Sequence, residues 1–151
     1  MQVEPRLDYE RVAPEAVRAL SALQATASER SGLEPSLLEL IRIRISQMNG
    51  CAYCLDFHFQ KAKSLGESEQ RLYLLGTWQD APVYTQRERA GLAWAEAVTR
   101  LGEDVGAAYA SALAQFSEAE IVNLTLAIVA INAWNRFNVS FRKVPSVRSS
   151  L

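Results

Sequence analysis

The chain has 151 residues, of which 49% are hydrophobic and 22% charged, and this composition predicts one globular domain with a full core. Its 16 Lys and Arg residues nearly balance 17 Asp and Glu residues without a basic block, which argues against nucleic acid as a partner. The opening residues, MQVEPRLDYE, lack the apolar stretch of a signal peptide. The most apolar run, 121–134, is shorter than the about 20 residues that cross a bilayer. We therefore expect a cytoplasmic protein with no membrane partner.

Helical patterns joined by short turns follow one another along the chain and predict an all-α fold. Pro35 opens a segment whose apolar residues fit one helical face, although its middle, IRIRI, alternates as a strand would. Asn49 and Gly50 form a turn signal, and TQRE from Thr85 and SEAE from Ser117 have the pattern of capping boxes. The predicted helices cover residues 16–27, 35–48, 52–65, 68–75, 85–100, 104–113 and 117–141.

Residues 1–151 are expected to form a single domain with its core at about 33–141. The arm 1–13, which is charged and broken by proline, and the tail 143–151 are expected to lie loose. The apolar surplus for a chain of this size also predicts that some surface is buried against another subunit.

Both cysteines and the single histidine of the chain fall within NGCAYCLDFH, residues 49–58. On a helix that starts near Cys51, this spacing of three and four puts all three side chains on one face. Helical side chains lean toward the N-terminus, so the His58 imidazole is expected close enough to Cys54 to take its thiol proton. Cys51, in the first turn, can close a disulfide with Cys54. The spacing predicts a redox pair in which Cys54 meets an oxidant and Cys51, the more outward sulfur, resolves it.

Other interpretations of the cysteine pair predict different behaviour. The pair could serve a general thiol–disulfide oxidoreductase, or a redox sensor with little peroxide turnover. A structural zinc site would need a carboxylate as its fourth ligand, because the chain has no further Cys or His. Haem attachment requires the histidine directly after the second cysteine, and Leu55 to Phe57 intervene here. The leading prediction therefore includes no bound metal or cofactor.

Glu39 is the candidate carboxylate partner of this cluster. If the helices on either side of Gly50 form an antiparallel hairpin, position 39 lies opposite about residue 60, within one turn of His58. A carboxylate there could fix the imidazole tautomer and raise its basicity. However, SLLE from Ser36 is also a capping-box pattern with Glu39 in the reciprocal position, so the residues alone leave both roles open.

Several polar side chains interrupt the apolar pattern of the last predicted helix. The segment NAWNR, residues 132–136, places polar side chains on an otherwise apolar helix. If buried, they must be hydrogen-bonded or face a cavity or subunit boundary, and Arg136 is a weaker candidate for a functional role.

The combination of Glu39 with Cys51-x-x-Cys54-x-x-x-His58, within LELIRIRISQMNGCAYCLDFH, resembles the AhpD-like alkylhydroperoxidases of the carboxymuconolactone decarboxylase superfamily. The segments QRLYLLGTWQDAPVYTQRERAGLAWAEAVT and INAWNRF are similar too, so the resemblance covers about 33–141. It implies an all-helical fold and association as trimers or hexamers. It also implies a thiol-dependent peroxidase that reduces a hydroperoxide and is reset by an external dithiol, such as a lipoylated or thioredoxin-like protein.

The resemblance also assigns roles to individual residues. It implies that Cys54 reacts with the peroxide, that Cys51 closes the disulfide, and that His58 and Glu39 form a proton relay. The best-known peroxidase of the group has a second histidine between its cysteines, where this chain has Tyr53. A simpler relay is therefore expected here. The decarboxylases of the superfamily do not depend on a cysteine pair, so the resemblance does not imply their activity.

Overall fold

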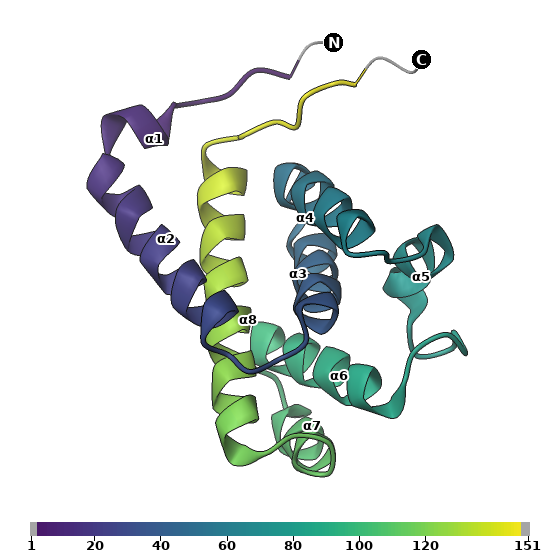
Figure 1. Cartoon of the computed structure of the whole chain (residues 1–151). Helices are drawn as coiled ribbons and strands as arrows, with labels where there is room; N and C mark the ends of the chain where they lie inside the picture. The colour runs from purple at the N-terminus through teal and green to yellow at the C-terminus, as the bar shows by residue number, and fades with distance from the viewer. Residues whose placement is uncertain (1–2, 149–151) are drawn as a thin grey trace.

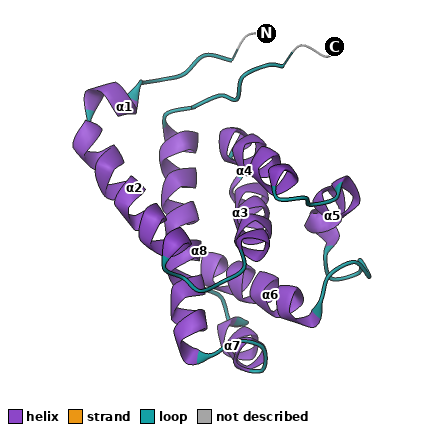
Figure 2. Ribbon diagram, viewed as in Figure 1, coloured by secondary structure: helices purple, strands orange, loops and turns teal. Residues whose placement is uncertain are grey.

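The computed structural model describes residues 3–148, and all regular structure within them is helical. Figure 1 shows how the helices are arranged, and Figure 2 shows that loops alone connect them. The helices are α1 (Tyr9–Val12), α2 (Pro14–Glu29), α3 (Pro35–Asn49), α4 (Ala52–Ser64), α5 (Glu69–Leu74), the 3-10 turn η1 (Leu75–Thr77), α6 (Gln86–Arg100), α7 (Val105–Leu113) and α8 (Glu118–Ser140). The predicted all-α fold is confirmed. Across residues 3–148, none of the helices combines the length and the apolar character needed to cross a bilayer.

Helix α3 lies at the centre of the domain. It packs against α4, α6 and α8, and α2 covers the other side of the long helix α8 (Figure 1). Consecutive α3 residues such as Ile41, Arg42 and Ile43 are all buried. A helix enclosed on every side needs no polar face, which explains why IRIRI lacks the usual helical periodicity.

The turn between α3 and α4 determines where the second helix begins. Gly50 ends α3 in the left-handed conformation with φ 67°, which glycine adopts without steric cost. The next amide, that of Cys51, donates to the carbonyl oxygen of Ser46 at 3.0 Å. Cys51 is then the N-cap of α4. The expected hairpin therefore folds at the predicted position.

Both predicted capping boxes are present. The Thr85 hydroxyl accepts from the Glu88 amide at the start of α6, and the Glu88 carboxylate accepts from the Thr85 amide. Ser117 and Glu120 repeat this arrangement at the start of α8. The reciprocal bonds satisfy amide groups that the first helical turn leaves free, which explains why these two boundaries could be predicted.

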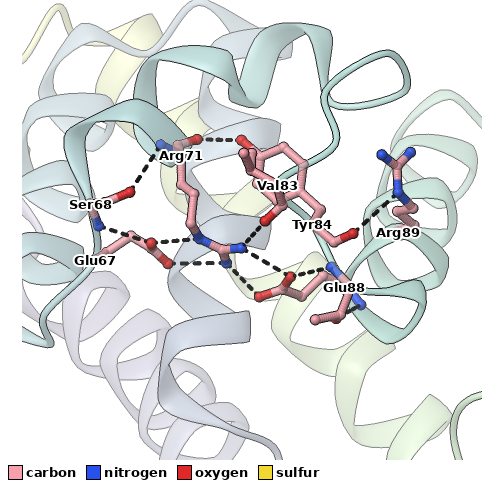
Figure 3. A network of polar contacts seen from close by, with 8 residues as sticks. Glu67, Ser68, Arg71, Val83, Tyr84, Glu88 and Arg89 are labelled. Carbon is pink, nitrogen blue, oxygen red and sulfur yellow. Dashed lines mark hydrogen bonds and ion pairs between the residues drawn. The ribbon is translucent and has the colours of Figure 1, made fainter.

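A polar network joins α5 to α6 across the intervening loop (Figure 3). The Arg71 guanidinium donates to Glu67 at 2.7 Å and to Glu88 at 2.5 Å, and it also donates to the carbonyl oxygen of Val83. The Tyr84 hydroxyl donates to the carbonyl oxygen of Arg71. One guanidinium therefore holds α5, the loop and the start of α6 together.

The N-terminal arm differs from the expected loose segment. Its described part contains α1, and Tyr9 in this helix is 4% exposed. The Tyr9 ring packs against Phe137 and Phe141, with centroids 5.4 Å from each. The arm lies beside the start of the C-terminal tail at one end of α8 (Figure 1), where the Arg6 amide donates to the Phe141 carbonyl oxygen. Aromatic burial provided by α8 orders this arm, and no local pattern in the arm indicates it.

The C-terminal tail is extended yet tied to the domain by ion pairs. Lys143 pairs with Glu10 of α1 at 2.6 Å, and Arg148 pairs with Asp56 of α4 at 2.7 Å. The last three residues of the expected loose tail, 149–151, lie outside the described residues.

Candidate active site

The two cysteines lie at the start of α4 and are bonded to each other as a disulfide. The Cys51 sulfur also accepts a hydrogen bond from the Cys54 amide at 3.2 Å. Cys51 and Cys54 are 2% and 3% exposed, so the expectation that Cys51 is the more outward sulfur is wrong. Cys51 belongs to the buried hydrophobic core, because the start of α4 packs against it.

The structure brings Glu39 to His58. The Nδ1 atom of His58 lies 2.7 Å from Oε2 of Glu39, and both side chains are buried. The antiparallel α3–α4 hairpin places the two residues opposite each other, as its turn position predicts. The alternative capping-box role is wrong, because α3 begins at Pro35 and its N-cap is Glu34, not Ser36.

Two cations that sequence reasoning missed as parts of the site accompany Glu39. Arg42, 2% exposed, donates from Nη1 to Oε1 of Glu39 at 2.6 Å and from Nη2 to the Ser28 hydroxyl at 2.6 Å. Lys61 lies 3.6 Å from the same carboxylate oxygen. The spacing of Glu39 and Arg42, three residues apart on one helix, is a signal that could have indicated this pair.

These neighbours determine the charge of Glu39. Burial acts to raise the pKa of its carboxyl, but the hydrogen bond from His58 and the charge of Arg42 outweigh burial. The pKa of Glu39 therefore lies below its ordinary value. Glu39 is ionised at neutral pH and accepts hydrogen bonds on both oxygens.

His58 is neutral under the same conditions. Burial lowers the pKa of the imidazole, and Arg42 and Lys61 lower it further, while the hydrogen bond to Glu39 acts in the opposite direction. The net pKa of His58 lies below its ordinary value. Because ionised Glu39 can only accept, the proton of neutral His58 resides on Nδ1, which leaves Nε2 as a base.

A cavity of about 410 Å³ opens beside the second cysteine. Both Cys54 and His58 line it. Of the two cysteines, both within the described residues, Cys54 is the one that faces this space. Its remaining wall combines aromatic and aliphatic groups with a few charges, including Tyr53, Phe57, Ile131, Trp134, Lys61 and Lys143. A cavity of this size can hold a small organic molecule against the Cys54 sulfur.

Two further residues reach the cysteine pair from distant parts of the chain. Asn138 of α8 donates from Nδ2 to the Cys54 sulfur at 3.3 Å. The Tyr9 hydroxyl donates to Oδ1 of Asn138 at 2.6 Å. No local sequence pattern indicates either contact, because 84 and 129 residues separate the partners.

The NAWNR segment makes the hydrogen bonds that its burial requires. Asn135, 1% exposed, donates to the Ser46 hydroxyl at 3.1 Å and accepts from Asn49 at 3.0 Å. Asn132 accepts from Asn49 at 2.9 Å. Arg136 is exposed and donates back to Oδ1 of Asn132, and it does not line the cavity beside Cys54. Within residues 3–148, no group of three or more His, Cys, Asp or Glu side chains is arranged to hold a metal ion.

Comparison with known proteins shows the family to which this chain belongs. Residues 14–97, which include Glu39, both cysteines and His58, match the carboxymuconolactone decarboxylase family. The uncharacterized protein YdfG of Bacillus subtilis (strain 168) is 34% identical over 140 residues, which cover 89% of this chain and 92% of that protein.

Two solved structures share the fold. One is a protein of unknown function from Agrobacterium tumefaciens, proposed there to be the antioxidant defence protein AhpD. It is 42% identical, with a TM-score of 0.89, and the match covers 95% of this chain and all of that one. The debrominase Bmp8 is 19% identical, with a TM-score of 0.80 over 90% of this chain and 74% of its own. From its matching sequence, its AhpD-like fold and its cysteine pair, this chain belongs to the carboxymuconolactone decarboxylase family.

Proposed function

We propose that the protein is a thiol-dependent peroxidase in which Cys54 reduces an organic hydroperoxide. The observation that carries this proposal is the shared cavity. Both Cys54 and His58 line it, and Oε2 of Glu39 lies 2.7 Å from Nδ1 of His58. A nucleophile, a base and a group that orients the base are the parts that thiol activation requires.

The chemical steps follow from these positions. His58 Nε2 takes the thiol proton of Cys54, and the resulting thiolate attacks the distal oxygen of the hydroperoxide. The O–O bond breaks, Cys54 becomes a sulfenic acid, and the leaving alkoxide takes the proton from His58. The Cys51 thiol then attacks the Cys54 sulfur and displaces water, which forms the disulfide. An external dithiol returns the pair to its reduced state by thiol–disulfide exchange.

Glu39 serves this sequence as a fixed charge. The hydrogen bond from His58 and the charge of Arg42 lower the pKa of Glu39 and keep its carboxylate ionised, so the mobile proton stays on His58 and does not pass on to Glu39. In this mechanism Glu39 holds the imidazole tautomer and stabilises the imidazolium that forms, as a buried carboxylate does in other base-activated nucleophiles.

The burial of both sulfurs favours a small oxidant over a protein disulfide. Cys54 is 3% exposed and meets solvent through the cavity, whereas exchange with a folded protein requires an accessible sulfur. A general thiol–disulfide oxidoreductase is therefore the less favoured alternative, and it predicts a different outcome in the same experiment.

The test is stopped-flow mixing of the reduced protein with cumene hydroperoxide or tert-butyl hydroperoxide. We expect the wild-type protein to consume peroxide and lose about two mass units as the disulfide closes. The Cys51→Ser variant should react once and accumulate a sulfenic acid on Cys54 that dimedone traps. The Cys54→Ser variant should not react.

A wild-type rate no higher than that of Cys54→Ser would contradict the proposal. If the wild-type protein ignores both peroxides but exchanges readily with a disulfide-bonded protein substrate, the oxidoreductase alternative holds instead. A separate reduction assay compares free dihydrolipoamide with reduced thioredoxin, and because both sulfurs are buried we expect the small dithiol to reduce the disulfide faster.

A further inference from the structure

Three buried side chains from three parts of the fold form one hydrogen-bonded chain that ends on the Cys54 sulfur. Tyr9 of α1 donates to Asn138 of α8 at 2.6 Å, and Asn138 donates to Cys54 of α4 at 3.3 Å. Tyr9 and Asn138 are each 4% exposed. Neither residue belongs to the cysteine–histidine–glutamate cluster, and both lie outside the matched family segment 14–97.

The direction of these bonds follows from the chemistry of each group. A thiolate can only accept a hydrogen bond, so the Asn138 amide must present its NH₂ group to Cys54. The Asn138 oxygen then faces away from the sulfur and needs a donor, which the Tyr9 hydroxyl provides. Burial raises the pKa of Tyr9, with Lys143 acting in the opposite direction, and Tyr9 therefore keeps its proton.

The surroundings of Tyr9 hold its hydroxyl in place. Its ring contacts Phe137 edge-on, at an interplanar angle of 75°, and Phe141 on a second side. The Lys143 ammonium lies 5.7 Å from the ring centroid. Because the ring is confined, the hydroxyl selects one of the two amide orientations of Asn138.

We propose that Asn138 is a catalytic residue, a hydrogen-bond donor that stabilises the Cys54 thiolate, and that Tyr9 is a positioning residue that orients the Asn138 amide. This inference rests on the proposed function, which makes Cys54 the reactive sulfur. A hydrogen bond donated to a charged thiolate is stronger than one donated to a disulfide sulfur. The Asn138 donor therefore stabilises the reduced state of the two cysteines relative to the disulfide.

Reduction of the Cys51–Cys54 disulfide takes up two electrons and, when Cys54 is left as a thiolate, one proton. An external dithiol supplies two electrons, the Cys51–Cys54 bond breaks, and the external dithiol becomes a disulfide. The external dithiol also releases two protons. One is taken up by Cys51 and the other by His58 or solvent, so Cys54 remains a thiolate that accepts the hydrogen bond from Asn138. Loss of the Asn138 donor should therefore raise the pH at which the thiolate forms and make the disulfide harder to reduce.

The first measurement is the alkylation rate of Cys54 by iodoacetamide as a function of pH, in a Cys51→Ser background that leaves one thiol. Asn138→Leu keeps the side-chain volume but removes the donor. We expect it to move the midpoint of thiolate formation upward and to lower the rate at pH 7 about tenfold. Tyr9→Phe keeps the ring packing and should give a smaller shift in the same direction.

Besides Tyr9, other ionisable residues line the cavity together with Cys54, and all of these remain in the variants. They are His58, Lys61, Lys143, Glu10, Glu29 and Tyr53. A difference from the parent protein therefore reports the changed residue and not these shared charges.

The second measurement uses the protein with both cysteines, equilibrated in dithiothreitol buffers of graded redox ratio. Asn138→Leu should shift the equilibrium toward the disulfide about tenfold, and Tyr9→Phe should shift it less. The matched controls are Asn123→Leu, which removes a half-buried α8 amide bonded to the Ser31 carbonyl oxygen, and Tyr109→Phe on α7. Neither control should change the midpoint or the equilibrium.

Equal shifts in Asn138→Leu and Asn123→Leu, or no shift in either, would overturn the inference. If Asn138→Leu fails to fold, Asn138→Ser and Tyr9→Phe decide the matter by the same two measurements. Neither measurement uses a peroxide. These shifts can therefore be observed even if the protein does not reduce peroxides. Equally, the protein can reduce peroxides while Asn138→Leu leaves the thiolate midpoint and the redox equilibrium unchanged.

Discussion

Glu39 and Arg42, one turn apart on α3, form an ion pair in which both side chains are almost completely buried, at 1% and 2% exposure. The Nη1 to Oε1 distance is 2.6 Å. The same carboxylate holds His58 with its other oxygen. The carboxylate that we propose orients His58 is therefore also one partner of a buried ion pair, and changes at Arg42 should affect both stability and chemistry.

Replacing Arg42 by Met should leave the Glu39 carboxylate buried without its principal cation. We expect the free energy of unfolding to fall by about 3–5 kcal/mol, because removing one partner leaves an uncompensated buried charge. Urea unfolding followed by circular dichroism measures the loss. Arg18→Met is the matched control, because Glu15 and Arg18 have the same order and spacing on α2 but are exposed. That variant should lose about 0–1 kcal/mol, and equal losses in the two variants would count against the buried pair.

Acidification should destabilise the folded protein through His58. The pKa of His58 in the folded state lies below its ordinary value of 6.5, so the unfolded chain binds more protons in this range. The stability present above pH 6.5 is therefore lost as the pH falls through the folded pKa. The pKa of Glu39, also lowered, adds a further loss below its ordinary value of 4.5.

Urea midpoints of the oxidised protein at pH 7.0, 6.0 and 5.0 test this dependence. His58 is the single histidine of the chain and the cysteines are bonded, so few other groups titrate in this window. The His58→Gln variant should show a flatter profile between pH 7 and 5. Parallel profiles for the two proteins would show that His58 is not the responsible group.

Replacing Glu39 by Gln should supply the wrong histidine tautomer. Arg42 would bind the amide oxygen, which turns the NH₂ group of the new side chain toward Nδ1 of His58. His58 would then carry its proton on Nε2 and could not accept one from Cys54. We expect the peroxide rate per folded molecule to fall about 100-fold or more.

Glu96→Gln provides the comparison for this experiment. Glu96 is likewise buried and bonded to an arginine, since it accepts from Arg44 at 2.6 Å and from Trp78 at 2.8 Å, but it does not line the cavity. This variant should lose stability and keep its peroxide rate. A similar loss of rate in both variants would mean that the effect is structural.

Replacing Asn135 by Leu should destabilise the core of the α3–α8 contact. The change leaves the Ser46 hydroxyl without its amide donor and removes one acceptor from Asn49. Unsatisfied buried polar groups cost about 1–3 kcal/mol each, so the free energy of unfolding should fall by an amount in that range. Arg136→Ala, on the neighbouring exposed position, should change it by less than about 0.5 kcal/mol. Thermal or urea unfolding separates the two outcomes.

Much of the fold was predictable because it depends on residues close together in the sequence. The capping boxes at Thr85 and Ser117 and the left-handed turn at Gly50 each form from side chains or backbone groups within a few residues. The position of that turn also fixes the register of the hairpin, which brought Glu39 to His58. Short-range hydrogen bonding therefore determined where these helices begin and end, and through the turn at Gly50 it placed Glu39 opposite His58.

The features that the sequence did not predict depend on contacts between residues far apart in the chain. The low exposure of Cys51 results from the packing of the start of α4 against the core. The helical spacing alone predicted, wrongly, that Cys51 is the more outward sulfur. Tyr9 lies in an arm without an apolar pattern of its own, and Asn138 reaches Cys54 across 84 residues. The sequence by itself determined the all-α fold and the grouping of the two cysteines with His58, and it indicated Glu39 as a partner without deciding between that role and a capping box. The tertiary structure decided which sulfur faces the cavity and which distant side chains contact it, because burial and hydrogen-bond direction are set by helix packing rather than by local spacing.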